Sequence, residues 1–307
     1  MNIRNTESFN TVRSFYWTVR SVVNLIYYSL ADHNVSYPAI SFMSNKDAVD
    51  EIVKEGRSMA RFGDGEFTWM LGYESCSGYQ LVSKELSARL AEVLHSDDER
   101  LVVGVLKVLN DDSPFTFRAR AFWKEFKHKK QAQIMEQLDL GKTYADSSIT
   151  RPYIDLKDKS GARSEFENLK RIWEKRNILL VEGRESRLGV GNDLFDNAAS
   201  LHRLLGPSTN AFSHYDAILE RALQLAGAYD CILLALGPTA TVLAYDLCRA
   251  GYQAVDIGHI DNEYEWMKMG AKRKTSIEGK NVDEVGTCAN AEVSDERYLR
   301  SIVGVID

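Results

Sequence analysis

Two carboxylates separated by a single glycine, Asp64 and Glu66, are the residues of this chain whose types and spacing most directly suggest chemistry. They follow the short apolar run 58–63, which ends just after Arg61. Side chains at positions i and i+2 of an extended chain point the same way, so the pair could converge on one cation. Two hard oxygen ligands with open positions suit Mg²⁺ or Mn²⁺ shared with a diphosphate. The alternative is a solvated β-turn after a strand.

Three other polar segments also come directly after apolar, strand-like runs. They are "GRESRLGVGNDLF" (183–195), "GPTAT" (237–241) and "HIDNEYEW" (259–266). Ligands of open α/β sheets bind outside the carboxyl ends of the strands. Four such coincidences in one chain therefore predict a single site at that edge of a sheet.

The glycine-rich segment places Arg184 and Arg187 beside a flexible loop, which suits phosphate recognition. Arginines in surface loops are more often simply solvated, and that alternative stays open. No third glycine follows Gly191 at the spacing of the dinucleotide-binding fingerprint. The sequence therefore gives little support to a NAD-dependent oxidoreductase.

The segment "GPTAT" resembles an anion cradle, because free N–H groups at a helix start lie beside the hydroxyls of Thr239 and Thr241. A helix that simply starts with a proline and a threonine cap is the alternative.

The segment "HIDNEYEW" supplies four titratable groups within seven positions. A histidine here could complete a metal shell or contact a phosphate, and one carboxylate could act as a general base. The alternative is an acidic helix start with Tyr264 and Trp266 in the core. The four groups are His259, Asp261, Glu263 and Glu265.

The elements that must position these residues alternate between strands and helices. Apolar runs predict strands at 58–63, 101–106, 177–183, 230–237, 252–258 and 301–306. Amphipathic patterns predict helices over 45–55 and 84–95, one opened by a capping box at Ser164 and Glu167, and one started at Ser113–Pro114. The segment 230–258 has the pattern of a right-handed βαβ unit in a buried parallel sheet. The expected fold class is α/β, a Rossmann-like, mostly parallel sheet flanked by helices.

The segment "SFYWTVRSVVNLIYYSL" (14–30) is rich in aromatic and branched residues and lies beside Arg13 and Arg20. It has no uninterrupted apolar run of spanning length and no small-residue cleavage site, so it fits neither a transmembrane helix nor a signal peptide. Its apolar residues recur at helical spacing, which leaves an interfacial membrane helix, a dimerisation helix and a helix packed on its own domain open. We divide the chain into an N-terminal amphipathic extension, 1–40, and one domain, 41–307. The spaced residues are Phe15, Val19, Val22, Val23 and Ile26.

Composition excludes several classes of protein. The 307 residues carry a net charge of −6, which argues against general electrostatic binding to nucleic acid. The four cysteines form no CxxC pair, so they predict neither a zinc knuckle nor a disulfide framework and fit a reducing cytoplasm. They are Cys76, Cys231, Cys248 and Cys288.

Taken together, the motifs resemble one family, the GT-D-type glycosyltransferases, a domain long of unknown function in bacterial glycan and adhesin-glycosylation clusters. The resemblance covers roughly residues 45–275, with the motifs in family order. They are "RFGDGE" (61–66), "TRPYIDLKDKS" (150–160), "VEGRESRLGVGNDLF" (181–195), "LGPTATVLAYDL" (236–247) and "DIGHIDNEYEW" (256–266).

The resemblance implies a Rossmann-like transferase that uses a nucleotide-sugar donor, commonly UDP-glucose, with Mn²⁺ or Mg²⁺ held by an Asp-x-Glu motif. Asp64 and Glu66 match that motif residue by residue, and we add His259 as a third metal ligand. We assign catalysis to Glu265, which lies one helical turn beyond Asp261, with Asp261 as the second candidate. Arg61 is expected to be a donor contact or a local counter-charge, unless it only pairs with Glu66. The expected donor-binding residues are Arg61, Gly63, Arg184, Ser186, Arg187, Gly237, Pro238 and Thr239.

The expected function is a metal-dependent transfer of a hexose, with glucose the first candidate, from a UDP-sugar to a glycan acceptor. The acceptor would be a lipid-linked or protein-linked glycan in bacterial polysaccharide or glycoprotein assembly. The expected location is the cytoplasm, either free or peripheral at the inner face of the membrane, with membrane association or homodimerisation through residues 13–30. Two alternatives are a metal-dependent hydrolase of nucleotide-sugar or phosphodiester bonds and a non-catalytic nucleotide-sugar-binding scaffold.

Overall fold

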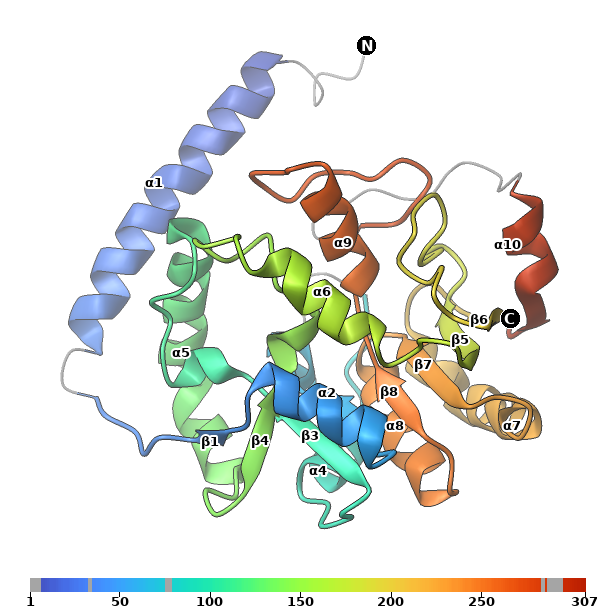
Figure 1. Cartoon of the computed structure of the whole chain (residues 1–307). Helices are drawn as coiled ribbons and strands as arrows, with labels where there is room; N and C mark the ends of the chain where they lie inside the picture. The colour runs from blue at the N-terminus through green and yellow to red at the C-terminus, as the bar shows by residue number, and fades with distance from the viewer. Residues whose placement is uncertain (1–6, 33–34, 75–78, 283–284, 286–294) are drawn as a thin grey trace.

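A parallel sheet with helices on both faces organises the chain (Figure 1). The computed structural model describes residues 7–32, 35–74, 79–282, 285 and 295–307, with side chains from Thr18 onward. Within these residues the sheet has nine strands in the order β1-β4-β3-β2-β8-β7-β5-β6-β9, and every neighbouring pair is parallel. The predicted fold class is therefore confirmed.

The bounds of the elements are as follows. The strands are β1 (Ser41–Phe42), β2 (Ser58–Arg61), β3 (Leu101–Val105), β4 (Thr143–Asp146), β5 (Asn177–Gly183), β6 (Ser200–Gly206), β7 (Cys231–Ala235), β8 (Ala254–Asp256) and β9 (Ile302–Val305). The helices are α1 (Glu7–Ala31), α2 (Asn45–Lys54), α3 (Asp64–Met70), α4 (Lys84–Leu94), α5 (Phe117–Gln137), α6 (Ala162–Lys170), α7 (Tyr215–Ala226), α8 (Pro238–Arg249), α9 (Ile260–Lys268) and α10 (Glu296–Ser301). Short 3₁₀ turns cover Lys107–Leu109, Ser147–Thr150 and Ala211–His214.

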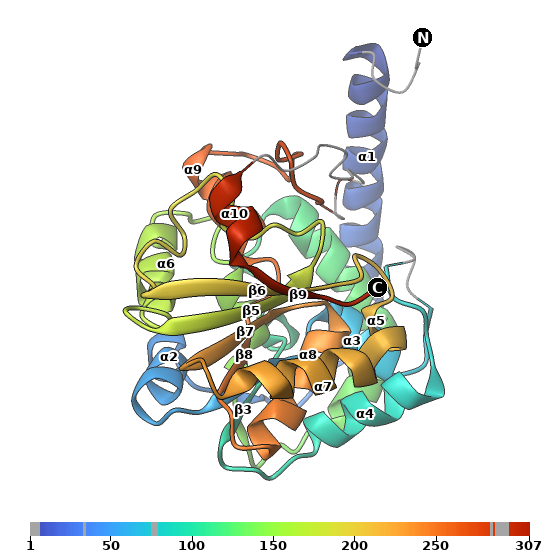
Figure 2. The same ribbon diagram turned by 90° about the vertical axis from the view of Figure 1, so that its right-hand side faces the viewer.

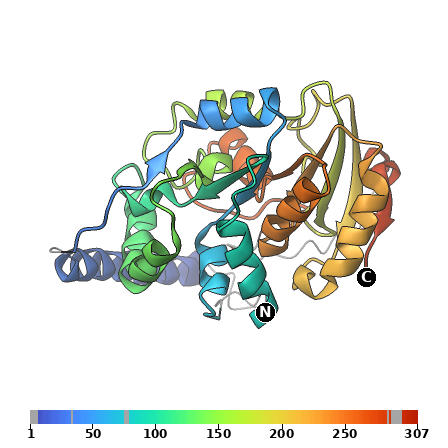
Figure 3. The same cartoon turned by 90° about the horizontal axis from the view of Figure 1, so that it is seen from below.

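The two faces of the sheet carry separate cores. In β5, Leu179 and Val181 point into a core with α3, α4, α7 and α8, whereas Ile178 and Leu180 point into a core with α2, α6 and α9. Figure 2 and Figure 3 show these two helix layers on opposite sides of the strands. Successive side chains of a strand alternate between faces, so a strand buried on both faces must be apolar throughout. This explains why β5 and β7 are continuous apolar runs.

The sequence-based elements agree with the structure where the apolar run is long. The strand predicted at 177–183 is β5, and the βαβ unit predicted within 230–258 is β7–α8–β8, whose two strands are parallel neighbours. The sequence did not predict β1, β4 or β6. In β6, Arg203 occupies the centre of the strand and is only 4% exposed, because it pairs with Glu182 of β5. Its charge concealed the strand from a hydrophobicity pattern.

Two predicted helix starts are wrong. Helix α6 begins at Ala162 after the N-cap residue Gly161, so Ser164 lies inside the first turn and its hydroxyl donates to the Gly161 carbonyl (2.8 Å). Helix α5 begins only after Thr116. Residues 114–115 are instead tied to another segment: the Pro114 carbonyl accepts from the Lys157 N–H, beside an isolated bridge between Phe115 and Leu156.

The predicted N-terminal helix is present as α1, and it lies along α5 (Figure 1). The Asn24 amide donates to the Glu125 carboxylate across this contact (2.7 Å). None of the helices in the described part of the chain is long and apolar enough to cross a membrane. The side chains of Arg13 and Phe15, which the sequence analysis placed on this helix, lie outside the described part of the chain.

The cysteines that the structure describes are consistent with a thiol state. Cys231 and Cys248 are buried and free, whereas Cys76 and Cys288 lie outside the described residues.

The order of the strands places the predicted site segments at one edge of the sheet. The four strands that precede them, β2, β8, β7 and β5, are consecutive in the sheet. Because all of these strands are parallel, their carboxyl ends meet at one edge. β2 and β8 are neighbours, but the strands that follow them in sequence lie in opposite directions. The strand after β2 is β3, on the side of β2 away from β8, and the strand after β8 is β9, at the opposite end of the sheet. Such a divergence is where open α/β sheets form a binding crevice.

Candidate active site

The carboxylates Asp64 and Glu66 lie in the first turn of α3. Gly63 is the N-cap, and its N–H donates to Glu66 Oε2 (2.9 Å). Carboxylates in a first turn are stabilised by the partial positive charge of the helix N-terminus. The expectation that the two side chains share one face of an extended chain is therefore wrong, because residues i and i+2 of a helix are about 200° apart around its axis.

Glu66 lies in a negative environment. Burial, followed by the negative charge of Asp256 and then that of Asp64, raises the pKa of Glu66 to about 7, and the positive charge of Arg61 only partly opposes this. A cation near these carboxylates would relieve the repulsion. The start of α3 is therefore electrostatically suited to a positively charged ligand.

The donor set can be tested for its fit to a divalent metal. Among the described residues no group of three or more His, Cys, Asp or Glu side chains is arranged to hold a metal, so His259 is not gathered with Asp64 and Glu66 into such a group. One or two carboxylates completed by water and substrate phosphates is, however, the usual way proteins bind Mg²⁺. The pair fits a cation shared with a diphosphate, not a closed protein cage.

Arg61 cross-links the strand ends beside this helix. Its guanidinium donates to the carbonyl oxygen and the Oδ1 atom of Asp256 (both 2.8 Å), to the Ser147 carbonyl (2.9 Å) and to Thr150 Oγ1 (3.0 Å). Asp256 is only 4% exposed. These bonds join the ends of β2 and β8 to the turn after β4, and they favour the counter-charge role of Arg61 over a donor contact.

Gly258 makes room for this cross-link. Its φ is +47°, and a Cβ atom there would lie 2.0 Å from Arg61 Nη2. Its N–H donates to Asp256 Oδ1 (3.0 Å). Only glycine combines this backbone conformation with the close approach of the guanidinium.

The start of α8 has only part of the features predicted for an anion site. Gly237 is the N-cap with φ +55°, and a Cβ atom there would lie 2.5 Å from the Tyr79 ring. Thr239 is fully buried, and its hydroxyl has no hydrogen-bond partner among the described residues. Pro238 has no N–H and the Ala240 N–H donates to the Gly237 carbonyl (2.9 Å), so the Thr239 hydroxyl, and not a set of free N–H groups, is the feature that suits an oxyanion. Thr241 instead has a structural role, since its hydroxyl donates to the Arg61 carbonyl (3.0 Å).

The two arginines after β5 do not lie together. The Arg184 guanidinium donates to the Ile306 carbonyl (2.9 Å) and to Asp307 Oδ1 (2.7 Å), beside the edge strand β9. Arg187 has φ +50° and donates to the Gly279 carbonyl (2.8 Å). The structure therefore directs Arg184 toward the edge of the sheet and Arg187 toward the segment that follows α9.

A buried ionic cluster holds the catalytic candidates of α9. Asp261, which is 1% exposed, accepts from the Gly189 N–H (2.8 Å), from Asn192 Nδ2 (2.7 Å) and from Lys280 Nζ (2.5 Å). Glu265 Oε1 accepts from Asn192 Nδ2 (2.7 Å) and lies 3.5 Å from Lys280 Nζ. Three donors engage Asp261, and two of them, Asn192 and Lys280, also engage Glu265.

Glu263 has a structural role. It is completely buried and accepts from the N–H groups of Tyr153 (3.2 Å) and Ile154 (2.9 Å). Burial raises the pKa of this carboxyl, although the positive charge of Arg151 opposes the effect. Glu263 thus anchors the segment after β4 to α9.

A small cavity of about 20 Å³ lies where these segments meet. Ser186, His259 and Asp261 line it, so the structure brings together predicted residues from the turns after β5 and β8. Tyr79, Asn192 and Lys280 are site residues that sequence reasoning missed. Asn192 lies inside the motif "GVGNDLF", but nothing local marks Tyr79 or Lys280. The remaining lining residues are Tyr79, Glu185, Leu188, Ser208, Asn262 and Asn281.

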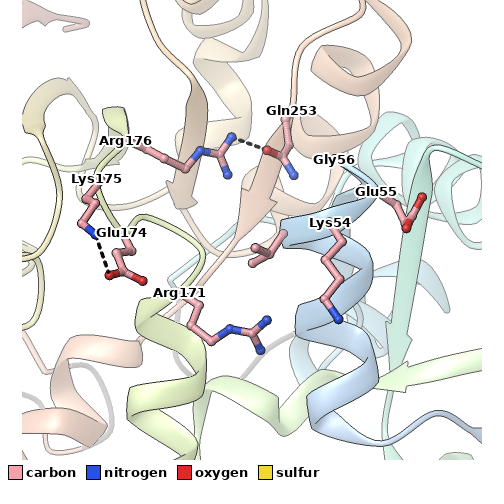
Figure 4. Close-up of a pocket in the computed structure, with 9 residues that line it drawn as sticks. Lys54, Glu55, Gly56, Arg171, Glu174, Lys175, Arg176 and Gln253 are labelled. Carbon is pink, nitrogen blue, oxygen red and sulfur yellow. Dashed lines mark hydrogen bonds and ion pairs between the residues drawn. The ribbon is translucent and has the colours of Figure 1, made fainter.

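A larger hollow of about 540 Å³ lies at the opposite end of the strands (Figure 4). Its residues Gly56, Arg176 and Gln253 precede β2, β5 and β8, respectively. In Figure 4, Arg176 points toward Gln253, with which it is hydrogen-bonded. Because ligands of parallel sheets bind at the carboxyl ends of strands, this hollow is not the candidate active site.

Comparisons with known proteins identify the family of this fold. The family description "Glycosyltransferase GT-D fold" matches residues 59–285. A Streptococcus pneumoniae serotype 4 protein named Glycosyltransferase GlyD is 41% identical over 262 residues, which are 85% of this chain and 32% of that protein. A Streptococcus gordonii protein named Probable glycosyl transferase Gly is 40% identical over 263 residues, which are 85% of this chain and 38% of its own length. The chain thus spans about a third of the length of these curated relatives.

Two solved structures share the architecture. One is described as a highly conserved domain of unknown function 1792 with a distinct glycosyltransferase fold; it is 35% identical with a TM-score of 0.82 and covers 94% of this chain and 100% of its own. The other, described as a new glycosyltransferase from Streptococcus sanguinis, is 38% identical with a TM-score of 0.80 and covers 87% of this chain and 100% of its own.

The first prediction concerns Gly258. The Gly258→Ala change should lower the free energy of unfolding by about 3–5 kcal/mol, because the new methyl group displaces Arg61 from buried Asp256. Urea unfolding measures this. The matched control is Gly56→Ala, where φ is +67° and the added Cβ meets nothing within 4 Å, so only backbone strain of about 1–2 kcal/mol is expected. Equal losses for the two variants would contradict the role assigned to Arg61.

The second prediction concerns the pH dependence of stability. The pKa of Glu66 is raised from 4.5 to about 7, so the folded protein holds this proton more tightly than the unfolded chain does. The resulting stabilisation is complete below pH 4.5 and is lost as pH rises through 7. Its size is at most about 3 kcal/mol. Unfolding curves of the wild type and Glu66→Gln, recorded without divalent metal, should diverge across this window, and parallel pH profiles would contradict the prediction.

Proposed function

The chain belongs to the family of glycosyltransferases with the GT-D fold, and from this membership we propose that it transfers a hexose, with glucose the first candidate, from a UDP-sugar to a glycan acceptor. The observation that best supports this is the meeting of four segments at the carboxyl ends of β2, β8, β7 and β5. They combine a carboxylate pair, a helix N-terminus with a free buried hydroxyl, and a further carboxylate. Those are the groups that transfer from a nucleoside diphosphate sugar needs.

The residues proposed to hold a divalent cation, Mn²⁺ or Mg²⁺, are Asp64 and Glu66, with His259 as the third candidate ligand. When bound, the cation supplies positive charge to the diphosphate that leaves the sugar. Burial and the negative charges of Asp256 and Asp64 raise the pKa of Glu66, which supports a cation at this point. Two carboxylates leave positions for phosphate oxygens.

The donor phosphates are proposed to bind at the start of α8. The hydroxyl of Thr239, which has no partner among the described residues, would donate to a phosphate oxygen, and Gly63, Ser186, Arg187, Gly237 and Pro238 would line the approach. Arg184 is the least supported member of the predicted donor set, because its guanidinium is bonded to residues 306 and 307.

Glu265 is proposed as the general base if transfer inverts the anomeric carbon. A base must take the proton from the acceptor hydroxyl on the side opposite the leaving group. Asn192 and Lys280 fix one oxygen of Glu265, and its side chain remains 15% exposed. In this arrangement Asn192 and Lys280 are positioning residues.

The proposed acceptor is a lipid-linked or protein-linked glycan in bacterial polysaccharide or glycoprotein assembly, handled on the cytoplasmic side of the membrane. A hydrolase of nucleotide-sugar or phosphodiester bonds could use the same carboxylates to activate water, and a binding scaffold could use the same phosphate contacts. Incubation of the protein with Mn²⁺ and a panel of sugar nucleotides separates the three. Release of UDP that requires an acceptor extract supports transfer, release that does not supports hydrolysis, and binding without release supports a scaffold.

The third prediction tests metal dependence. Asp64→Asn and Glu66→Gln should each weaken Mn²⁺ binding and abolish sugar transfer, because each removes one anionic ligand. Excess chelator should do the same to the wild type. Calorimetry and UDP release measure these effects. Glu85→Gln, which changes an acidic residue in the first turn of α4, is the matched control. Full activity of both site variants, or of the wild type in chelator, would refute the metal proposal.

The fourth prediction separates the two candidate bases. Glu265→Gln keeps the hydrogen bond to Asn192 but removes basicity, so it should bind UDP-sugar normally and lose about 10²–10⁴-fold in turnover. Asp261→Asn should mainly lower the thermal midpoint, because it leaves Lys280 buried with less compensation. Turnover, donor affinity and thermal unfolding are compared for both variants. Near-normal turnover of Glu265→Gln together with an inactive, well-folded Asp261→Asn would transfer the base role to Asp261.

A further inference from the structure

The small cavity beside α9 is lined by a buried hydroxyl that has no partner within the protein. Ser208 follows β6 and lines the cavity of about 20 Å³. Its Oγ atom is buried and makes no hydrogen bond within the described part of the chain. An unpaired buried hydroxyl costs free energy, because it has lost its water without gaining a protein partner. Such a group in the wall of a cavity is available to pair with a bound ligand.

A glycine brings a second hydroxyl to the same cavity. Gly183 ends β5, and a Cβ atom there would lie 3.2 Å from Ser186 Oγ and 3.4 Å from the Cα atom of Ser208. A larger residue at position 183 would therefore crowd both serines. Because glycine has no side chain, the ends of β5 and β6 can hold Ser186 and Ser208 in the wall of one cavity.

The rest of the wall has the composition of a carbohydrate site. A sugar presents hydroxyls that both donate and accept, which carboxylate, amide and imidazole groups can match. It also presents a face of C–H groups that can pack on an aromatic ring. The cavity offers both kinds of partner, since its wall contains Tyr79 together with Glu185, His259, Asp261, Asn262 and Asn281.

The position of the cavity beside the proposed base indicates which part of a nucleotide-sugar donor reaches it. Asp261 lines the cavity, and the Asn192 amide joins Asp261 to Glu265 by donating to both carboxylates (2.7 Å each). A base that takes the proton of the acceptor hydroxyl must lie near the anomeric carbon of the transferred sugar. The nucleoside lies on the other side of the diphosphate, so the cavity beside Glu265 is on the side of the sugar.

The cavity has room for about one water molecule, so a hexose can enter only if part of the wall moves. The ring of Tyr79 is the part best placed to do so. The Tyr79 carbonyl accepts from the Asn210 N–H (2.8 Å), and the next residue, Gln80, is buried. The ring itself lies against Gly237, which has no side chain. Rotation of the ring about its Cα–Cβ bond would enlarge the cavity and leave this main-chain bond intact.

We propose that this cavity is the pocket for the sugar of the donor, that Ser208 pairs with one hydroxyl of the sugar, and that the Tyr79 ring moves aside to admit it. The inference rests on the proposed function, because it takes a nucleotide sugar as the donor. It goes further by assigning the choice among sugars to Ser208, which contacts the sugar and not the diphosphate.

Calorimetry in the presence of Mn²⁺ tests the pocket, with UDP, UDP-glucose, UDP-galactose and UDP-N-acetylglucosamine as probes. The measured quantity is the affinity for the best-bound sugar nucleotide divided by the affinity for UDP, because this ratio isolates the sugar. Ser208→Ala should lower the ratio about three- to tenfold, as expected for the loss of one hydrogen bond, and leave the affinity for UDP unchanged. Ser208→Leu should lower it about tenfold or more, because the larger side chain fills the cavity.

The matched control is Ser164→Ala, which removes an exposed hydroxyl of α6 and should change neither affinity. Thermal unfolding verifies that the variants are folded, and if Ser208→Leu is not, Ser208→Ala decides the test. An unchanged ratio in folded Ser208→Ala, or an equal loss of affinity for UDP and for the sugar nucleotide, overturns the sugar pocket and leaves the proposed function standing. A wild type that binds none of the sugar nucleotides refutes the proposed function and the pocket with it, so the two failures are distinguishable.

Discussion

The buried ion pair between Arg61 and Asp256 is the interaction on which the rest of the site depends. It joins the carboxyl ends of β2 and β8, and the same guanidinium reaches the turn after β4. The hydroxyl of Thr241, on α8, donates to the Arg61 carbonyl. One arginine thus sets the relative positions of α3, α8 and α9, which carry the metal, phosphate and base candidates. Removing one partner of a buried pair leaves an uncompensated charge, so such a link is costly to lose.

Two further buried pairs repeat this principle around the site. Glu182 pairs with Arg203 and accepts from the Leu188 N–H, which fixes the start of the loop after β5. Asp261 pairs with Lys280 and holds the next residue of that loop, Gly189, to α9. At these points each buried carboxylate has a cation beside it. Glu66 differs, because its neighbours Asp256 and Asp64 add negative charge that Arg61 opposes only in part, and this contrast supports the proposal of a metal ion there.

Helix α1 differs from the helices of the domain in leaving most of its described apolar side chains exposed. Inside the domain, apolar faces meet and charges are paired; in the described part of α1, Asn24 contacts the domain, whereas Val23, Ile26 and Leu30 are exposed. The attachment to α5 through Asn24 and Glu125 leaves these apolar side chains exposed.

The sequence by itself determined the elements whose signals are local. The continuous apolar runs of β5 and β7 and the Pro-started α8 could be predicted, since burial on both faces of a parallel sheet demands such patterns. The rule that ligands bind at the carboxyl ends of parallel strands predicted that the segments after four strands would share a site. The strand order places those four strands side by side. The sequence motifs that identified the family are local as well.

Only the tertiary structure decided what each polar side chain contacts. A charged residue looks the same in a sequence whether it binds a ligand or a neighbour, because its partner can lie far along the chain. Arg61 meets Asp256 across 195 positions, Arg184 bonds to the residues at 306 and 307, and Lys280, which no local pattern marked, lies buried against Asp261. The helical geometry of Asp64 and Glu66 was also missed, because the cap that starts α3 is formed by a backbone N–H and a side chain that folds back onto it. Partners that are distant in sequence are set by strand order and loop packing, and these arise only when the chain has folded.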